Sequence, residues 1–469
     1  MSDSKSQITP TYLEKEFFSK RPSQIIELNK IITPILNKLH QVQHSERFWL
    51  QLLNPHLKSC IGQKTMLEQK SIRLNVPLYS INSFSLITHK QIVKAIVIYL
   101  GRALKYRNPL KSILEILKNE TTICLGGRCE IIAKYNNGKA LPVYFPLREL
   151  LTPDIRARRR LKRIISNEVS ETFLNNVLLS LPRVYVEYFN NLYHAIPIKD
   201  AEYKSFHYEH AGSVFSEFIM AKYQEAGSKI VAYQTGGFMG EWENHPDEIF
   251  YFLVDELRTY GWKTNEKDVP DRAYRLEEYA EKWQYYKIKS VAHQDLLIVL
   301  STINKRKESH YKHFTNYFFK NINYEKFHNI WVRPRPLSKH VDNRREAHKI
   351  GITSDLANID SGKRSLAEVS ANAKLVIQTW MPSTNFLECL AVDQAVVAIN
   401  TNDRPSKIFS SFLIDLHRLG ILHEDVSALT TFLNELESIE KWWQSVISDP
   451  VYLSFKKTFC GFKQGNVGK

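Results

Sequence analysis

The sequence predicts an α/β protein built on parallel, Rossmann-like sheets and preceded by a helical N-terminal region. Three observations lead to this prediction. The chain has 469 residues, which suggests two or three domains at roughly 100–200 residues each. From residue 212 onward, short β-branched apolar runs alternate with helical segments, as in strands joined by right-handed crossovers. Before that point, apolar residues recur mainly at helical spacing.

The first part of the chain contains the predicted helices. Apolar spacing predicts helices over residues 13–32, 45–61 and 91–104. Pro34 is expected to mark a break or a new start, and Pro55 is expected to interrupt the second helix. Residues 122–125 are a predicted buried strand. The basic run at residues 154–163 is interpreted as a solvated helix face or, alternatively, as a surface for an anionic membrane leaflet.

Strands and helices alternate through the rest of the chain. The predicted strands are residues 229–233, 249–255, 295–301, 329–333, 374–378 and 395–399. The predicted helices are residues 212–226, 311–322, 366–373, 383–392 and the tail at 425–462. Pro334 and Pro336 are expected to stop the strand before them. The charged segment 277–289 is expected to link two domains, so we expect domains at residues 1–290 and 291–445, followed by residues 446–469.

Composition narrows the classes of function. The formal charge of +15 favours anionic partners such as nucleotide phosphates, nucleic acid or an acidic membrane face. The five cysteines are scattered and form no CxxC pair, which argues against a disulfide framework and a zinc ribbon. The polar N-terminus and the short apolar runs predict neither a signal peptide nor a membrane span. We therefore expect a cytoplasmic protein, soluble or peripheral at the inner membrane, without a metal or cofactor.

The strongest motif is the segment 374–399. A predicted parallel strand ends near Gln378, and a helix opens at Ser383 and Thr384. Ligands of open α/β sheets bind outside the carboxyl ends of strands, where a helix N-terminus attracts phosphate. The two hydroxyls add donors, and Glu388, one turn further, could accept bonds from ribose hydroxyls. The alternative is that Ser383 only caps the helix.

A second anion clamp is predicted at the turn that contains Arg333 and Arg335. This turn follows a strand of the same domain, and two prolines flank Arg335. The guanidinium group presents a planar fork of donors that suits phosphate. The alternative is a surface turn whose basic residues have no ligand.

A glycine-rich loop begins at Gly236 and Gly237, and glycine lets a backbone approach a substrate closely. The alternative is a tight structural turn. Transfer to a sugar hydroxyl needs a general base, and carboxylate and histidine residues surround this loop. The candidates for the base are His210, Glu217, Glu241 and Asp255, in no order of preference.

Several stretches together resemble an uncharacterised family of bacterial transferases that is found with surface-polysaccharide genes. They are residues 45–58, 206–240, 252–263, 376–399 and 412–462, the last with the Trp442-Trp443 pair. One departure concerns the position before the paired glycines, where this chain has Thr235 and the family usually has His. If that His is catalytic in the family, this chain uses another group or has lost activity.

The wider similarity is to glycosyltransferases with two Rossmann-like domains facing a cleft, the GT-B-like arrangement. The resemblance implies a nucleotide donor on the C-terminal domain and a final helix that crosses back toward the first domain. Arg335-Pro336 and Ser383-Thr384 look similar to phosphate-binding turns of transferases that use CMP-activated acidic sugars, although those usually have His where Arg335 stands.

Three hypotheses for the function follow. The first is a glycosyltransferase that moves a sugar from a nucleotide-sugar donor to a glycan or lipid-linked acceptor of surface polysaccharide or lipopolysaccharide. The second is a polyol-phosphate transferase that uses the same motif. The third is an inactive relative that acts as a binding or partner protein. Nucleic acid is not expected as a partner, because the basic run at residues 154–163 contains no interleaved aromatic residue.

Overall fold

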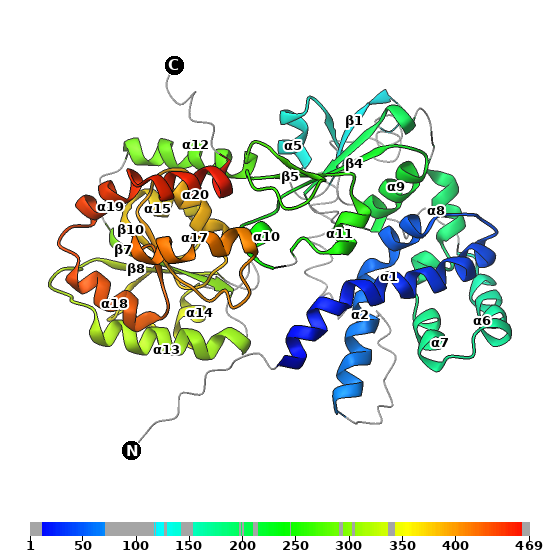
Figure 1. Ribbon diagram of the computed structural model, residues 1–469, viewed down its shortest axis with the longest axis horizontal. Coiled ribbons are helices and arrows are strands. Elements are labelled where there is room, and N and C mark those ends of the chain that lie inside the picture. Colours follow the sequence, from blue (N-terminus) through cyan, green and yellow to red (C-terminus); the bar gives the residue numbers. More distant parts are fainter. Residues whose placement is uncertain are drawn as a thin grey trace. The chain divides into compact units, whose positions relative to one another are not determined.

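The structure of the chain is a computed structural model (Figure 1). It describes residues 12–70, 117, 119–125, 129–141, 153–196, 198, 201–209, 214–243, 245–289, 294–302, 305–335 and 343–461. Contacts divide the chain into two compact units. The first unit is Met1–Tyr233 with Asp247–Glu256, and the second is Gln234–Pro246 with Leu257–Lys469. The helix expected at residues 91–104 lies outside the described residues.

The first unit begins with two long helices that pack against each other, α1 (Tyr12–His40) and α2 (Glu46–Lys70). The expected breaks at Pro34 and Pro55 are wrong, because both prolines lie inside continuous helices. Buried leucine and isoleucine side chains on both sides of each proline offset the lost backbone hydrogen bond. The other helices that the structure describes in this unit are α5 (Cys129–Tyr135), α6 (Ala157–Glu168), α7 (Thr172–Leu179), η2 (Arg183–Tyr185), α8 (Phe189–Ala195), η3 (Ala201–Tyr203), α9 (Val214–Glu225) and α11 (Glu248–Leu253).

The first sheet has the strand order β2-β1-β3-β4-β5-β6. Its strands are β1 (Thr122–Leu125), β2 (Lys139–Ala140), β3 (Ser205–Tyr208), β4 (Lys229–Tyr233), β5 (Glu256–Thr259) and β6 (Asp268–Pro270). The pairs β1–β2, β1–β3, β3–β4 and β5–β6 are parallel. The predicted strands at residues 122–125 and 229–233 are confirmed.

The strand predicted at residues 249–255 is wrong, because this segment forms helix α11. Asp247 caps the helix, and its Oδ1 accepts a hydrogen bond from the Phe250 backbone N at 2.8 Å. A short apolar run is compatible with a buried strand or a buried helix, so the cap decides between them. The strand in this region is β5, which begins at Glu256, directly after the predicted segment. Its charged residues Glu256 and Arg258 interrupt the apolar pattern by which a strand is recognised in the sequence.

The second sheet has the strand order β12-β11-β10-β7-β8-β9, and its neighbouring strands are parallel. Its strands are β7 (Gln294–Thr302), β8 (Ile330–Arg335), β9 (Asn358–Ile359), β10 (Ala373–Gln378), β11 (Val396–Ile399) and β12 (Leu422–His423). Read from β9, this is the doubly wound 3-2-1-4-5-6 order, whose switch point lies between the first and fourth strands. The switch point is therefore between β7 and β10. Strand β8 passes through Pro334 and ends at Arg335, so the stop expected before Pro334 is wrong.

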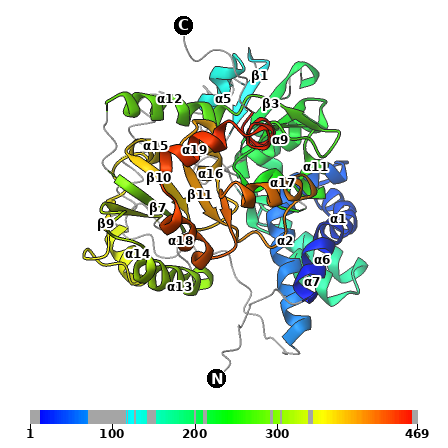
Figure 2. The same ribbon diagram turned by 60° about the vertical axis from the view of Figure 1, so that its left-hand side comes forward.

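Helices cover both faces of the second sheet (Figures 1 and 2). Both views show α12 and α19 on one side of the sheet and α13 and α14 on the other. The helices of this unit are α10 (Phe238–Glu241), α12 (Tyr274–Lys289), α13 (Lys305–Asn321), α14 (Asn343–Lys349), α15 (Leu366–Ala371), α16 (Thr384–Ala391), α17 (Lys407–Arg418), α18 (Val426–Glu435), α19 (Ile439–Ile447) and α20 (Pro450–Cys460). The end of α20 reaches the turn after β5, where the Lys457 backbone oxygen lies against Gly261.

The central strands β7, β10 and β11 form the core of the second unit, with their apolar side chains almost completely buried. This continuous burial explains why these strands are apolar throughout rather than alternating. The α/β class, the two parallel Rossmann-like sheets and the helical N-terminal region are confirmed. Among the described residues, no helix has the length and apolar character needed to cross a bilayer.

Candidate active site at the switch point of the second sheet

Helix α16 begins at the switch point, directly after β10. Ser383 occupies the N-cap position, and the first helical residue is Thr384. The Ser383 side chain makes no capping hydrogen bond, and its hydroxyl donates instead to Gln378 Oε1 at 3.3 Å. Ser383 therefore does not cap the helix with its hydroxyl, and the N-terminal backbone donors of α16 face the carboxyl edge of the sheet.

The glycine loop lies directly on this helix start. The Gly237 backbone N donates to Thr384 Oγ1 at 3.1 Å. A Cβ atom on Gly236 would lie 2.5 Å from the same oxygen, and one on Gly237 would lie 2.9 Å from the Ser383 backbone oxygen. Only glycine permits this approach. A hydroxyl both accepts and donates, so the bond from Gly237 uses only the acceptor side of the Thr384 hydroxyl.

A series of polar side chains continues from the start of α16 to α12. Gln378 donates to Asn385 Oδ1, and Asn385 Nδ2 donates to Glu388 Oε2 at 3.3 Å. Arg275 of α12 lies with its Nε 3.6 Å from Glu388 Oε1, and its Nη1 donates to the Thr235 backbone oxygen. Glu388 is only 12% exposed, so it holds α16 and α12 together. Its expected contact with a ribose remains a proposal.

Basic and aromatic side chains gather on the other side of the switch point. Lys307, in the first turn of α13, donates from Nζ to Ser301 Oγ at 2.8 Å. The same Nζ lies 4.0 Å from the centroid of the Trp380 ring, which follows β10. The His310 ring packs perpendicular to that ring, with 5.3 Å between the centroids. Arg335 ends β8 and is exposed. Burial lowers the pKa of Lys307, and the charge of Arg335 lowers it further.

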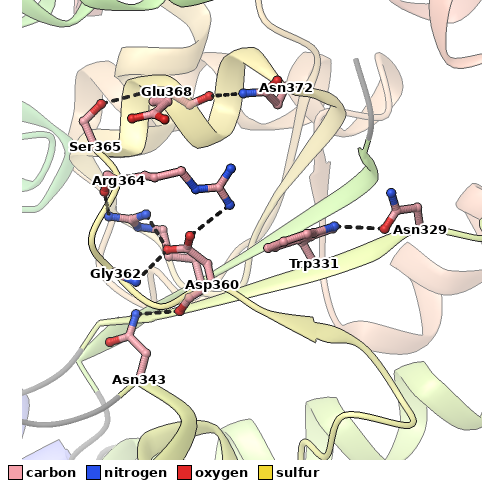
Figure 3. Close-up of polar contacts among 10 residues, drawn as sticks. Asn329, Trp331, Asn343, Asp360, Gly362, Arg364, Ser365, Glu368 and Asn372 are labelled. Atoms are coloured by element: carbon pink, nitrogen blue, oxygen red, sulfur yellow. Dashed lines mark hydrogen bonds and ion pairs between the residues drawn. The ribbon is translucent and has the colours of Figure 1, made fainter. Parts of the chain in front are cut away.

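Arg333 has a different environment from Arg335. Its guanidinium donates to Asp360 Oδ2 at 2.6 Å and to the backbone oxygen of Arg364. Figure 3 shows Asp360 at the centre of this network, with Arg364 and Asn343 directed toward it. Asp360 is 1% exposed, and burial lowers the pKa of Arg333. Arg333 therefore balances a buried carboxylate, whereas Arg335 faces solvent.

Glu241 closes the glycine loop at the end of α10 and is fully buried. Asn402 Nδ2 and the Ser406 backbone N donate to its backbone oxygen at 3.1 and 2.8 Å. Neither carboxyl oxygen has a hydrogen-bond partner among the described residues. Burial raises the pKa of Glu241 well above its usual range, so this environment favours the protonated form.

The other candidates for the base belong to the first unit. Glu217 of α9 is largely buried, which raises its pKa to about 7. Asp255 accepts from Arg47 Nη2 at 2.7 Å and from the Ile230 backbone N at 2.8 Å, so its carboxylate joins α2 to the sheet. His210 lies outside the described residues. Among the described residues, no group of three or more His, Cys, Asp and Glu side chains could hold a metal ion.

The structure thus brings together one part of the predicted site. Gly236, Gly237, Ser383 and Thr384 meet at the start of α16, and Glu388 and Glu241 lie in the same unit. The glycine loop belongs to the second unit, whereas its position within residues 1–290 had placed it in the expected first domain. Sequence reasoning missed Lys307 and Trp380. Each of the two residues follows a predicted strand, which is where ligands bind in such sheets. The sequence did not show that these two strands are neighbours at the switch point, and only the strand order reveals this.

Similarity to known proteins is found in a family model and in solved structures. The family model described as "LIC12162 family transferase" matches residues 88–464. No curated protein sequence matches significantly. Similar solved structures include the wall teichoic acid polymerase TagF (10% identity, 56% of this chain and 74% of that chain, TM-score 0.32). A Listeria monocytogenes protein described as a UDP-N-acetylglucosamine 2-epimerase is 10% identical, with 73% of this chain and 92% of that chain covered and a TM-score of 0.38.

Staphylococcus aureus MnaA, in a co-structure with UDP, has 10% identity, covers 76% and 88% of the two chains, and gives a TM-score of 0.34. TM-scores this low identify no shared substrate. The family match is different, because it spans most of the chain and both sheets. It includes the glycine loop and the start of α16 that the structure joins. The chain therefore belongs to the LIC12162 family of transferases.

Proposed function

We propose that this transferase is a glycosyltransferase, which moves a sugar from a nucleotide-activated donor to a surface-polysaccharide or lipopolysaccharide acceptor. One observation carries the proposal. Thr384 is the first residue of α16, at the switch point of a doubly wound sheet. Its hydroxyl accepts a hydrogen bond from the backbone N of Gly237 in the glycine loop. A donor phosphate at this point would meet the helix N-terminus and the Thr384 O–H.

In the proposed reaction, the bond between the anomeric carbon and the donor phosphate oxygen breaks, and the electron pair stays on the phosphate. The α16 N-terminus, Thr384 and Arg335 stabilise the charge of this leaving group. The acceptor hydroxyl oxygen forms the new bond to the anomeric carbon and gives its proton to a base. The candidates for this base are Glu217, Glu241, Asp255 and His210. We test Glu217 first, because burial raises its pKa to about 7 and a base works well when its pKa is near the working pH.

Nucleotide binding tests this proposal. Thr384→Ala should weaken binding roughly 10- to 100-fold, because a hydrogen bond to a charged group contributes about 1.5–3 kcal/mol. Thr384→Ser keeps the hydroxyl and is the matched control. Calorimetric titration of UDP-, GDP-, dTDP- and CMP-sugars, including a CMP-activated acidic sugar, measures the affinities. Equal affinities for wild type and Thr384→Ala would contradict the site.

Product analysis tests the reaction. Transfer of the sugar alone supports a glycosyltransferase, whereas transfer of a polyol together with its phosphate would identify the polyol-phosphate alternative. Glu217→Gln should lower turnover and leave the affinity for nucleotide nearly intact. A wild-type chain that binds no nucleotide would favour an inactive relative that serves as a binding partner.

We also propose peripheral contact with an anionic membrane through α6. Two of its arginines are paired within the first unit, Arg158 with Glu187 and Arg160 with Asp154. The exposed cations of this helix are Arg159, Lys162 and Arg163. Co-sedimentation with vesicles containing phosphatidylglycerol should fall when Lys162 and Arg163 are both changed to Glu. Equal sedimentation of wild type and variant would contradict this contact.

A further inference from the structure

Two cations lie side by side at the carboxyl edge of the second sheet. In the register of β7 and β8, Thr302 is the partner of Arg335. Lys307 reaches back from the first turn of α13 to Ser301, the residue before Thr302. The two cationic side chains are close enough for Arg335 to lower the pKa of Lys307, after the larger effect of burial.

No carboxylate forms an ion pair with Arg335 among the described residues. Two cations held together in this way repel each other, and partial burial increases the cost. An anion placed between them would offset that cost.

Trp380 connects this pair to the start of α16. The ring follows β10 by two residues and precedes the Ser383 N-cap by three. Lys307 lies over the ring, and His310 fixes the same turn by a 2.9 Å contact between Nε2 and the Thr379 backbone oxygen. The cations and Thr384 therefore border one switch point, from β7 and β8 on one side and from β10 on the other.

We infer that Lys307 and Arg335, next to Trp380, form a second anion subsite, so that the donor carries two anionic groups at this switch point. The second group is either the distal phosphate of a nucleoside diphosphate sugar or the carboxylate of an acidic sugar on a nucleoside monophosphate. This inference rests on the proposed donor site at Thr384 and adds the class of donor that the site takes.

The test compares ligands that differ by one anionic group. Calorimetric titration with UMP and UDP, and with CMP and a CMP-activated acidic sugar, measures the gain from the second group. In one of the two pairs, we expect the ligand with the additional anionic group to bind about tenfold tighter or more than the ligand without it. Lys307→Ala and Arg335→Ala should each remove most of that gain, while Lys307→Arg retains it. Lys312→Ala, on the same helix, is the matched control.

The outcomes separate the two proposals. Two results together support both the Thr384 site and the second subsite. Thr384→Ala should lose affinity for UMP and UDP alike, and Lys307→Ala should lose affinity only for the ligand with the additional anionic group. Equal binding of the two members of each pair by wild type, or equal weakening of both by Lys307→Ala, overturns the second subsite and leaves the Thr384 site standing. The gain in the UMP–UDP pair identifies a diphosphate, and a gain only in the CMP pair identifies an acidic sugar.

Proton uptake gives a second measurement. Lys307 has a pKa lowered to about 8 in the ligand-free chain. An anion at the subsite favours the charged form, so binding near that pH should take up protons. Titrations in buffers of different ionisation enthalpy should show this uptake in wild type and not in Lys307→Ala. Binding without uptake in wild type would count against Lys307 as a ligand of the anion.

Discussion

The buried carboxyl of Glu241 makes the stability of this protein depend on pH in a way that one substitution should remove. The side chain is fully buried, and neither oxygen has a hydrogen-bond partner among the described residues. Its carboxyl lies against the glycine loop, where a Cβ on Gly237 would be 2.8 Å from Glu241 Oε1. Burial raises the pKa of Glu241 well above its ordinary value of 4.5, so the folded chain holds a proton that the unfolded chain releases.

The magnitude follows from linkage. Below pH 4.5 both states hold the proton, and above the folded pKa neither does. Between these limits the folded state binds one proton more, so the free energy of unfolding falls by about 1.4 kcal/mol for each pH unit. Glu241→Gln keeps a neutral polar group of similar size but does not titrate. The stability of this variant relative to wild type should therefore rise between roughly pH 5.5 and roughly pH 6.5, by at most about 1.4 kcal/mol.

Urea unfolding followed by tryptophan fluorescence at the two pH values measures this difference. Glu243→Gln is the matched control, because Glu243 is two residues further along the same loop and its side chain is 55% exposed. The control should show a stability difference from wild type that changes little with pH. A pH-independent difference for Glu241→Gln, or the same change in the control, would show that Glu241 ionises normally in the folded chain.

Three further predictions concern other parts of the structure. Asp360→Asn should lower the free energy of unfolding by about 3–5 kcal/mol, because it leaves the buried Arg333 guanidinium without its counter-charge; a loss below about 1 kcal/mol in urea unfolding would contradict this. If Glu217 is the base, turnover should rise as the pH passes about 7 and its carboxyl loses the proton, and this rise should be absent in Glu217→Gln. Gly237→Ala should cost about 1–3 kcal/mol of stability, because the added Cβ would lie 2.9 Å from the Ser383 backbone oxygen; unchanged thermal unfolding would mean that the loop does not rest on α16.

The sequence predicted most of the second sheet correctly. β7, β10 and β11 are short runs of β-branched and other apolar residues, and such runs stay recognisable because both faces of a parallel sheet are buried. The start of α16 was also predicted, since Ser383 and Thr384 stand between a strand and an amphipathic helix. Prediction failed where local pattern was ambiguous. Residues 249–255 have no period that separates a strand from a helix, and the Asp247 cap selects the helix.

The composition and local patterns of the sequence by themselves determined the α/β class, the parallel second sheet and the helix start at Thr384, because these depend on residues close together in the chain. Only the tertiary structure decided that Arg333 pairs with Asp360 while Arg335 stays exposed, and that Lys307 lies over Trp380. It also decided that Gly237 bonds to Thr384, which is 147 positions away. These contacts join segments whose neighbours are set by strand order and loop path, and no local pattern encodes which strand ends will meet.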